Sequence, residues 1–181
     1  SSFPARFEKV GIVLDTSRSM YGNDTQKLRP AAISLAIRDM IKATAQDNVV
    51  VRTDGREDTR LPFPKGETSL ALALVEALEE EPDAVFVITD GYENAPAGRF
   101  METLKKVRDL GIETPVYQLS PVAAAESLGI KQLAQGLAEA LPVTNPTALG
   151  PSMMKAMLRQ DPEEGVKALI GLALKTIGHE A

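Results

Sequence analysis

The sequence contains no cysteine and no tryptophan, and its one histidine is His179, close to the C-terminus. The absence of cysteine excludes disulfides and thiolate metal sites, and it is typical of proteins from the reducing cytoplasm. A single histidine so far along the chain argues against a histidine-based metal or catalytic centre. Aromatic residues make up only 4% of the chain, so we expect a largely aliphatic core.

Long apolar runs and positive charge are also scarce. No run approaches the roughly 18 apolar residues of a membrane span, and the sequence does not start with a basic segment followed by an apolar one, as a signal peptide does. The net charge is -5 and the isoelectric point is about 5.0, whereas binding to nucleic-acid phosphates usually needs a concentrated basic surface. We therefore expect a cytoplasmic domain with no membrane segment and no direct nucleic-acid binding.

The length of 181 residues suits one domain with a well-filled core. We predict that this domain spans 1–181, with a core over about 8–145 and a helical extension over about 147–178. The opening segment "SSFPARFEKV" lacks an initiator methionine and leads directly into an apolar run. This start suggests a piece excised from a longer protein.

Three short apolar runs predict strands. They are "KVGIVLD" ending at Asp15, "NVVVRT" ending at Thr53 and "DAVFVITD" ending at Asp90. Each run is nearly continuous rather than alternating, which indicates a strand buried on both faces. A fourth run, "TPVYQLS" at 114–120, contains Pro115 and is expected nearer an edge of the sheet.

Helical periods lie between these runs. One apolar stripe that ends at Ala45 predicts a helix over 27–46, and a second predicts a helix over 69–80. A third helix contains 100–107 and is closed by Gly111. Strands that alternate with amphipathic helices predict an α/β fold, a three-layer, doubly wound and mostly parallel sheet with helices on both faces.

Two further segments carry structural expectations. The polar stretch "DGREDTRLPFPKG" at 54–66 leaves room for a very short strand near Thr59–Leu61, which would be an antiparallel edge strand. The last third of the chain reads as helical, with one short helix around Met153–Leu158 and a longer one that begins with an aspartate cap and a proline at 161–162.

Oxygen-bearing side chains gather at the predicted strand ends. Asp15, Ser17 and Ser19 alternate where the first strand ends, so they can point the same way. Thr68 lies just before a helix, and Asp90 ends another strand. If the strands that end at Asp15 and Asp90 are neighbours at the reversal of strand order, their carboxylates face one crevice. An all-oxygen set suits hard divalent cations, Mg²⁺ in particular.

The residues alone leave other readings open. Asp15, Ser17 and Thr68 could simply cap helices. Asp15 could be the nucleophile of a phosphohydrolase or phosphotransferase with Lys65 near the phosphate, although haloacid-dehalogenase-like enzymes carry a second aspartate where this chain has Ser17. The domain could also be purely structural and bind no ion.

Three motifs resemble the metal-ion-dependent adhesion site of von Willebrand factor type A domains. They are "DTSRS" at 15–19, "GET" at 66–68 and "TDG" at 89–91, which occur in the family's order and context. The resemblance extends over 8 to about 145. It implies a six-stranded sheet with helices on both faces and one short antiparallel edge strand.

The resemblance also implies a ligand set. Ser17, Ser19 and Thr68 would contact Mg²⁺, for which Mn²⁺ or Ca²⁺ could substitute, and Asp15 and Asp90 would act partly through waters. One coordination position would stay open for an aspartate or glutamate of a partner protein. Two carboxylates acting partly through waters leave the field of the ion incompletely screened, so an incoming carboxylate is attracted.

The function that this resemblance implies is non-enzymatic protein interaction inside a larger bacterial intracellular assembly. Relatives of this kind accompany ring ATPases or, fused to a helical-repeat ring, form RNA-binding proteins of the Ro type, so partners would include a ring ATPase or other domains of the parent protein. Arg18, Tyr92 and Asn94 are candidate contacts at the rim of the site. The segment at 52–66 is short for the family, so the edge hairpin is expected to be reduced.

Overall fold

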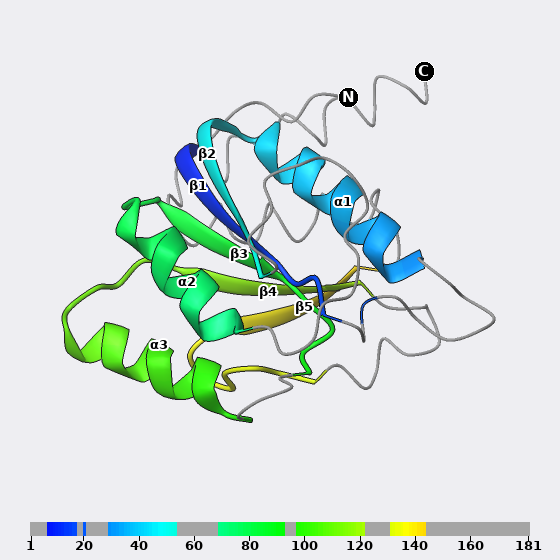
Figure 1. The fold of residues 1–181 in the computed structure, drawn as a ribbon. Helices are drawn as coiled ribbons and strands as arrows, with labels where there is room; N and C mark the ends of the chain where they lie inside the picture. The colour runs from blue at the N-terminus through cyan, green and yellow to red at the C-terminus, as the bar shows by residue number, and fades with distance from the viewer. Residues whose placement is uncertain are drawn as a thin grey trace, which may run out of the picture.

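The computed structural model describes residues 7–17, 20, 29–53, 69–92, 97–121 and 131–143. These residues form the strands and helices labelled in Figure 1. In chain order the elements are β1 (Phe7–Leu14), α1 (Arg29–Lys42), β2 (Ala45–Arg52), α2 (Leu70–Glu79), β3 (Ala84–Ile88), α3 (Arg99–Asp109), β4 (Val116–Pro121) and β5 (Glu139–Val143).

The described strands form one five-stranded sheet in the order β2-β1-β3-β4-β5. All four strand pairs are parallel. The order reverses between β1 and β3, because the chain builds to one side of β1 first and to the other side afterwards. The predicted doubly wound α/β fold is confirmed. The antiparallel strand near Thr59–Leu61 and the helices after 147 lie outside the described residues.

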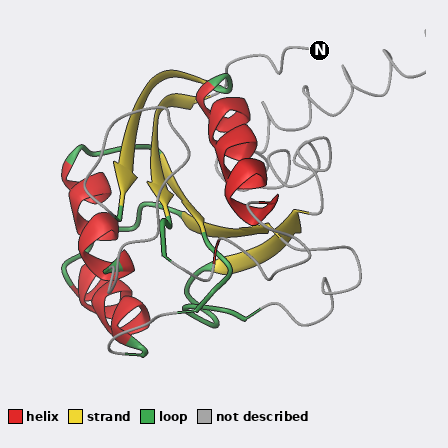
Figure 2. Ribbon diagram, turned by 45° about the vertical axis from the view of Figure 1, so that its right-hand side comes forward, coloured by secondary structure: helices red, strands yellow, loops and turns green. Residues whose placement is uncertain are grey.

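Helices cover both faces of this sheet, as Figures 1 and 2 show. Ile12 and Leu14 of β1 pack in the core beneath α1, whereas Val13 between them packs beneath α2 and α3. β3 alternates in the same way, with Phe86 on the α1 side and Val87 on the other. Because successive side chains point to opposite faces, a strand between two helical layers must be apolar at nearly every position.

Three of the described aromatic residues, Phe7, Phe86 and Tyr117, pack on the α1 side of the sheet, whereas Phe100 packs on the other side. The ring of Phe86 stacks on Tyr117 at a centroid distance of 5.4 Å and meets the edge of Phe7 at 6.0 Å. These three rings cross β1, β3 and β4 in a row. The rest of the buried apolar side chains are almost all aliphatic, as predicted.

The predictions for α1 and β2 are partly wrong. α1 ends at Lys42, and Ala45 starts β2 instead of extending the helix to 46. The cause is Thr44, whose backbone N–H and hydroxyl both donate to the carbonyl of Ile41, at 2.9 and 2.7 Å, and so close the helix. β2 was expected to be buried on both faces, but it is half-buried at the edge of the five described strands.

The other two helices match their predictions. Ser69 caps α2 by accepting a hydrogen bond from the backbone N–H of Leu72 at 3.2 Å. α3 ends at Asp109, and Gly111 just beyond it has a φ of +82° and donates to the carbonyl of Arg108 at 2.9 Å. This left-handed glycine closes the helix as predicted. None of the described helices is long and apolar enough to cross a membrane.

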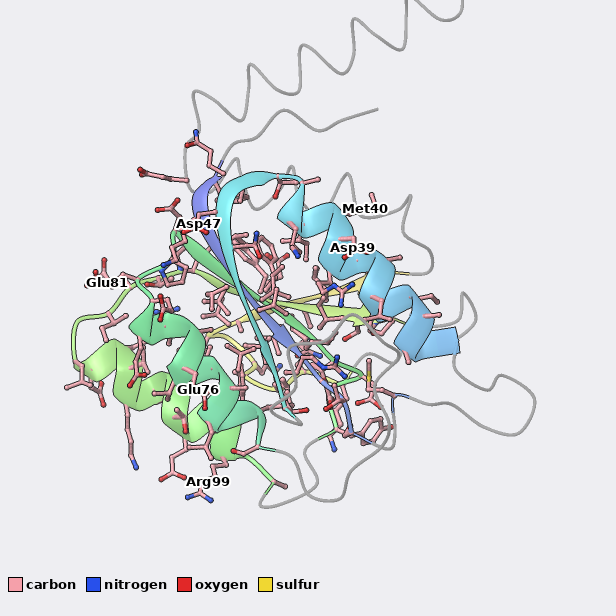
Figure 3. All side chains as sticks on the ribbon, turned by 45° about the horizontal axis from the view of Figure 1, so that its top comes forward. Asp39, Met40, Asp47, Glu76, Glu81 and Arg99 are labelled. Atoms are coloured by element: carbon pink, nitrogen blue, oxygen red, sulfur yellow. The ribbon has the colours of Figure 1, made fainter. Side chains whose placement is uncertain are left out.

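Polar side chains project from the outer sides of the helices. Asp39 on α1, Glu76 on α2 and Arg99 on α3 are exposed, and Figure 3 shows side chains of this kind around the outside of the fold. The apolar sides of the helices face the sheet, so no described helix is apolar all round.

Prolines occur beside β4 and within β5. Pro115 precedes β4, so its missing N–H removes no bond from the sheet, and its carbonyl accepts the N–H of Val85 at 2.9 Å. β4 lies one strand in from β5, the edge strand on its side. The sequence did not predict β5, because Pro142 interrupts its short apolar run.

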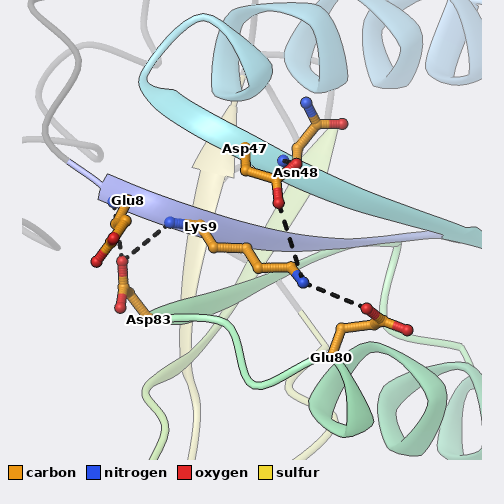
Figure 4. Close-up of polar contacts among 6 residues, drawn as sticks. All are labelled: Glu8, Lys9, Asp47, Asn48, Glu80 and Asp83. Carbon is orange, nitrogen blue, oxygen red and sulfur yellow. Dashed lines mark hydrogen bonds and ion pairs between the residues drawn. The ribbon is translucent and has the colours of Figure 1, made fainter.

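The amino ends of β1 and β3 are joined by Asp83, as Figure 4 shows. Its carboxylate accepts the backbone N–H groups of Glu8 at 2.9 Å and Lys9 at 3.0 Å. Its own N–H donates to the carbonyl of Lys9 at 2.9 Å. The Lys9 ammonium in turn lies 3.2 Å from Glu80 and 4.0 Å from Asp47. The amino ends of these strands are therefore held by the hydrogen bonds of one carboxylate and by the ion pairs of one lysine.

We predict that Asp83→Ala lowers the free energy of unfolding by about 1–2 kcal/mol, because two strand N–H groups lose a charged acceptor. Glu80→Ala in the same cluster should cost less than about 1 kcal/mol, since it removes only an exposed ion pair. Urea unfolding of both variants measures the difference. Equal losses would contradict a distinct role for Asp83.

Candidate cation site

The carboxyl ends of β1 and β3 lie side by side at the point where strand order reverses. Leu14 pairs with Ile88 in register, and the ladder continues one residue further because the N–H of Asp15 donates to the carbonyl of Ile88 at 3.0 Å. The N–H of Thr89 similarly donates to the carbonyl of Leu119 at 3.1 Å. The expectation that the first strand and "AVFVITD" are neighbours is confirmed. The backbone of Asp15 is therefore held in place by β3.

Both carboxylate oxygens of Asp15 accept hydrogen bonds. The backbone N–H of Ser17 donates to Oδ1 at 2.8 Å, and the hydroxyl of Thr89 donates to Oδ2 at 2.6 Å. The Thr89 oxygen accepts in turn the N–H of Gly91 at 3.1 Å. Asp15 is only 2% exposed. A nearly buried carboxylate thus connects the turn after β1 to the turn after β3.

Burial raises the pKa of the Asp15 carboxyl above its ordinary value of 3.8, and the nearby charge of Asp90 raises it further. The hydrogen bonds from Thr89 and Ser17 oppose this rise in pKa but do not outweigh burial. The charged form of Asp15 is therefore disfavoured in the fold. A bound cation would favour the charged form.

Hydrogen bonds within the turn after β1, and from this turn to Thr53, hold it in place. Ser17 is buried, and its carbonyl accepts the N–H of Met20 at 3.1 Å. Thr16 points to β2, where the Thr53 oxygen accepts its N–H at 2.9 Å and lies 2.8 Å from its hydroxyl oxygen. Alternate residues therefore contact different parts of the fold. Ser17 contacts Asp15, and Thr16 connects the turn to Thr53 at the end of β2.

The turn after β3 brings in the second carboxylate. Asp90 is partly exposed, and its Oδ1 accepts the N–H of Tyr92 at 3.1 Å. Gly91 between them has a φ of +88°, a conformation that favours glycine. Tyr92 is 54% exposed. The two carboxylates are near enough for the charge of Asp90 to act on Asp15.

The structure brings together three of the five predicted metal ligands, Asp15, Ser17 and Asp90. The other two, Ser19 and Thr68, lie outside the described residues. The predicted rim residues divide in the same way. Tyr92 is described, and Arg18 and Asn94 are not.

Sequence analysis missed three residues around this site. Thr89 was quoted within the "TDG" motif, yet its position at a strand end beside Asp15 was not used as a signal. Gln118 reads as a strand residue and Lys131 as a loop residue, so no pattern in the sequence marks either one. Their contacts depend on how β4 and the loop before β5 meet in space.

The donor set fits a hard cation that uses neutral oxygen ligands as well as carboxylates. Within the described residues, no three aspartate, glutamate or histidine side chains gather as a metal-binding group. A cation held by Asp15 and Asp90 would therefore need hydroxyl ligands, and Ser17 already contacts the carboxylate of Asp15. An all-oxygen set of this kind is suited to Mg²⁺ with retained waters.

No protein-family model matches this sequence, and no curated protein matches it. Among solved structures, the chain is similar to the crystal structure of the Deinococcus radiodurans RO (RSR) protein, with a TM-score of 0.56 and 19% sequence identity. The match covers 86% of this chain and 35% of that chain, so the present chain spans about a third of that protein's length. At this identity the likeness shows the α/β fold alone.

We predict that Asp15→Asn stabilises the protein at about pH 7 in the absence of divalent cations, by on the order of 1 kcal/mol. The raised pKa of Asp15 means that its contribution to stability is complete below 3.8 and is lost as the pH rises through the folded-state pKa. The variant has no charge to bury, so its advantage should shrink as the pH falls toward the ordinary pKa of 3.8. Urea unfolding in EDTA at several pH values measures this, with exposed Asp47→Asn as the control. A variant advantage that grows on acidification would contradict the prediction.

We also predict that Gly91→Ala is far more damaging than Gly111→Ala. Both glycines have positive φ, so either substitution should cost about 1–2 kcal/mol in backbone strain. A Cβ on Gly91 would lie 1.9 Å from the carbonyl oxygen of Lys131, whereas one on Gly111 meets nothing within 4 Å. The clash should add about 1–3 kcal/mol to the loss at Gly91. Thermal unfolding of the two variants compares them, and equal losses would contradict close contact between these loops.

Proposed function

We propose that this chain is a divalent-cation-dependent protein-interaction domain of the von Willebrand factor type A kind. In this function a Mg²⁺ ion at the carboxyl edge of the sheet binds an aspartate or glutamate of a partner protein. The observation that carries the proposal is the meeting of Asp15 and Ser17 with Asp90 at the strand-order reversal, where Thr89 links the two turns.

The chemistry of the described donors supports this function. Asp15 and Asp90 supply negative charge, and Ser17 supplies a neutral oxygen beside them. Ser19 and Thr68, which lie outside the described residues, would complete the proposed ligand set. The ion would supply a position where a carboxylate can bind. Since much of the set is neutral, the ion would keep enough positive field to attract that carboxylate.

The burial of Asp15 supports the proposal further. Water is largely excluded from this carboxylate, so its charge is not solvated, and burial raises its pKa. A bound cation would stabilise this site, because its positive charge would offset the cost of burying the carboxylate. Structural strand ends usually avoid such a charge, because a neutral side chain would be more stable there.

We propose no enzymatic role for the chain. A nucleophilic Asp15 of the haloacid-dehalogenase kind would need a second aspartate two residues later as acid and base, and that position holds Ser17. The partner we propose is a protein that offers an acidic side chain, either another domain of the parent protein or a ring ATPase, in the cytoplasm. The likeness to the Deinococcus radiodurans protein carries no part of this proposal.

Calorimetry with Mg²⁺ and with Mn²⁺ tests the site directly. The parent chain should bind one ion, and the double variant Asp15→Ala, Ser17→Ala should bind none. At a free ion concentration of about 100 times its dissociation constant, the parent should gain about 2.7 kcal/mol in unfolding free energy. The control is the double variant Asp47→Ala, Asn48→Ala, which removes an acidic and a polar side chain from the opposite edge of the sheet.

Circular dichroism shows whether each variant keeps the fold. Loss of ion binding in the site variant alone supports the proposal. No heat and no ion-dependent stabilisation of the parent would reject it, as would equal ion binding by the parent and a folded site variant. Turnover of a phosphomonoester that Asp15→Asn abolishes would favour a phosphohydrolase instead.

A further inference from the structure

The backbone of Lys131 lies against the turn that carries Asp90. A Cβ atom placed on Gly91 would lie 1.9 Å from the carbonyl oxygen of Lys131 and 2.8 Å from its carbonyl carbon. Only a glycine allows the two segments to approach this closely. Lys131 is therefore part of the surface beside the candidate cation site, although it is 40 residues from Gly91 in sequence (131 minus 91).

A buried glutamine fixes Lys131 in this place. The side-chain amide of Gln118 donates to the Lys131 carbonyl at 2.8 Å, and its oxygen accepts the N–H of Leu133 at 2.9 Å. The same amide group lies 3.0 Å from the hydroxyl of Ser120. Gln118 is only 2% exposed. Since buried polar groups lose free energy when they lack partners, this glutamine holds the segment 131–133 firmly on β4.

The side chain of Lys131 returns to the same turn. Its ammonium nitrogen lies 4.6 Å from the centroid of the Tyr92 ring. The Tyr92 N–H donates to Asp90, so the ring and the candidate ligand belong to one turn. A cation is attracted to the face of an aromatic ring, and the ring leaves the ammonium N–H groups able to donate to an anion.

The charge of Lys131 is not neutralised by a carboxylate in the part of the chain that the structure describes. The ion pairs there involve Lys9, Arg38 and Lys106. Lys9, at the opposite edge of the sheet, is paired with two acidic side chains. Lys131 instead contacts the uncharged ring of Tyr92, in the turn that carries Asp90.

We propose that Lys131, supported by Tyr92 and positioned by Gln118, is a second anion-binding position that selects partners with more than one carboxylate. One carboxylate of the partner binds the cation and a neighbouring one binds the Lys131 ammonium. The partner segment is therefore an acidic peptide and not an isolated aspartate or glutamate in an apolar segment. This inference rests on the proposed function, because it assigns the partner of the same site.

Two capped pentapeptides test this selection. One contains five aspartates, which present a second carboxylate at every spacing, and the other contains one central aspartate between asparagines. Their dissociation constants are measured by calorimetry on the parent chain and on Lys131→Met, both saturated with Mn²⁺. Methionine keeps an apolar stem for Tyr92 and removes the charge. Lys42→Met is the matched control, because Lys42 is exposed at the end of α1, next to the amino end of β2.

The measured quantity is the preference for the five-aspartate peptide, given by the ratio of the two dissociation constants. The five-aspartate peptide can bind in more registers, but this advantage is the same for each protein and cancels when the ratios of two proteins are compared. We expect this preference to fall by about two- to fivefold in Lys131→Met, the size of one exposed ion pair. It should stay unchanged in Lys42→Met. Lys131→Met should bind Mn²⁺ at least as tightly as the parent, because it removes a nearby positive charge. The preference of the parent should also weaken as salt is added.

The outcomes separate this inference from the proposed function. A parent that binds Mn²⁺ and both peptides, with the same preference as Lys131→Met, overturns the role of Lys131 and leaves the cation site standing. Peptide binding that is equally strong in EDTA overturns the shared site. A parent that binds no Mn²⁺ overturns the proposed function, and the inference fails with it.

Discussion

The hydrogen bond between Thr89 and Asp15 is the contact on which the candidate site depends. It is 2.6 Å long and joins two turns that are 74 residues apart in sequence. The carboxylate it reaches is almost inaccessible to water, so local donors must satisfy it. Ser17 supplies the other bond from its backbone, and Gly91 donates to Thr89. The geometry of both turns is thus set by one buried charge.

The sheet creates this constraint. In a doubly wound parallel sheet, the strands on either side of the order reversal release their following turns in opposite directions, which leaves a crevice between them. Asp15 follows β1 and Asp90 follows β3, so the two side chains are brought together by topology and not by local sequence. Two helical layers exclude water from the interior, and burial raises the pKa of the Asp15 carboxyl at this position. The same burial that disfavours the charge makes the position receptive to a cation.

Sequence patterns predicted most of this arrangement. They failed where a single contact determines where an element ends or which residue lies near the site. Continuous apolar runs located β1 and β3, because strands between two helical layers have no polar face. The end of α1 was misplaced, since the closing contact of Thr44 with Ile41 leaves no periodic signal. β5 is short and contains Pro142, so neither length nor alternation marked it. Gln118 and Lys131 escaped notice for a different reason. A buried glutamine is recognised only when the backbone it binds is known.

The lysines at the amino ends and at the carboxyl ends of the strands have different contacts, and this difference affects how a partner would be recognised. At the amino edge, Lys9 is balanced by Asp47 and Glu80. At the carboxyl edge, Lys131 lies over an aromatic ring instead. The net charge of -5 repels an acidic partner at long range. Because exposed charges are screened beyond about 8 Å at physiological salt, attraction must come from groups within the site itself. A cation and one lysine act at that distance, so they would govern how long an acidic partner stays bound more than how fast it arrives.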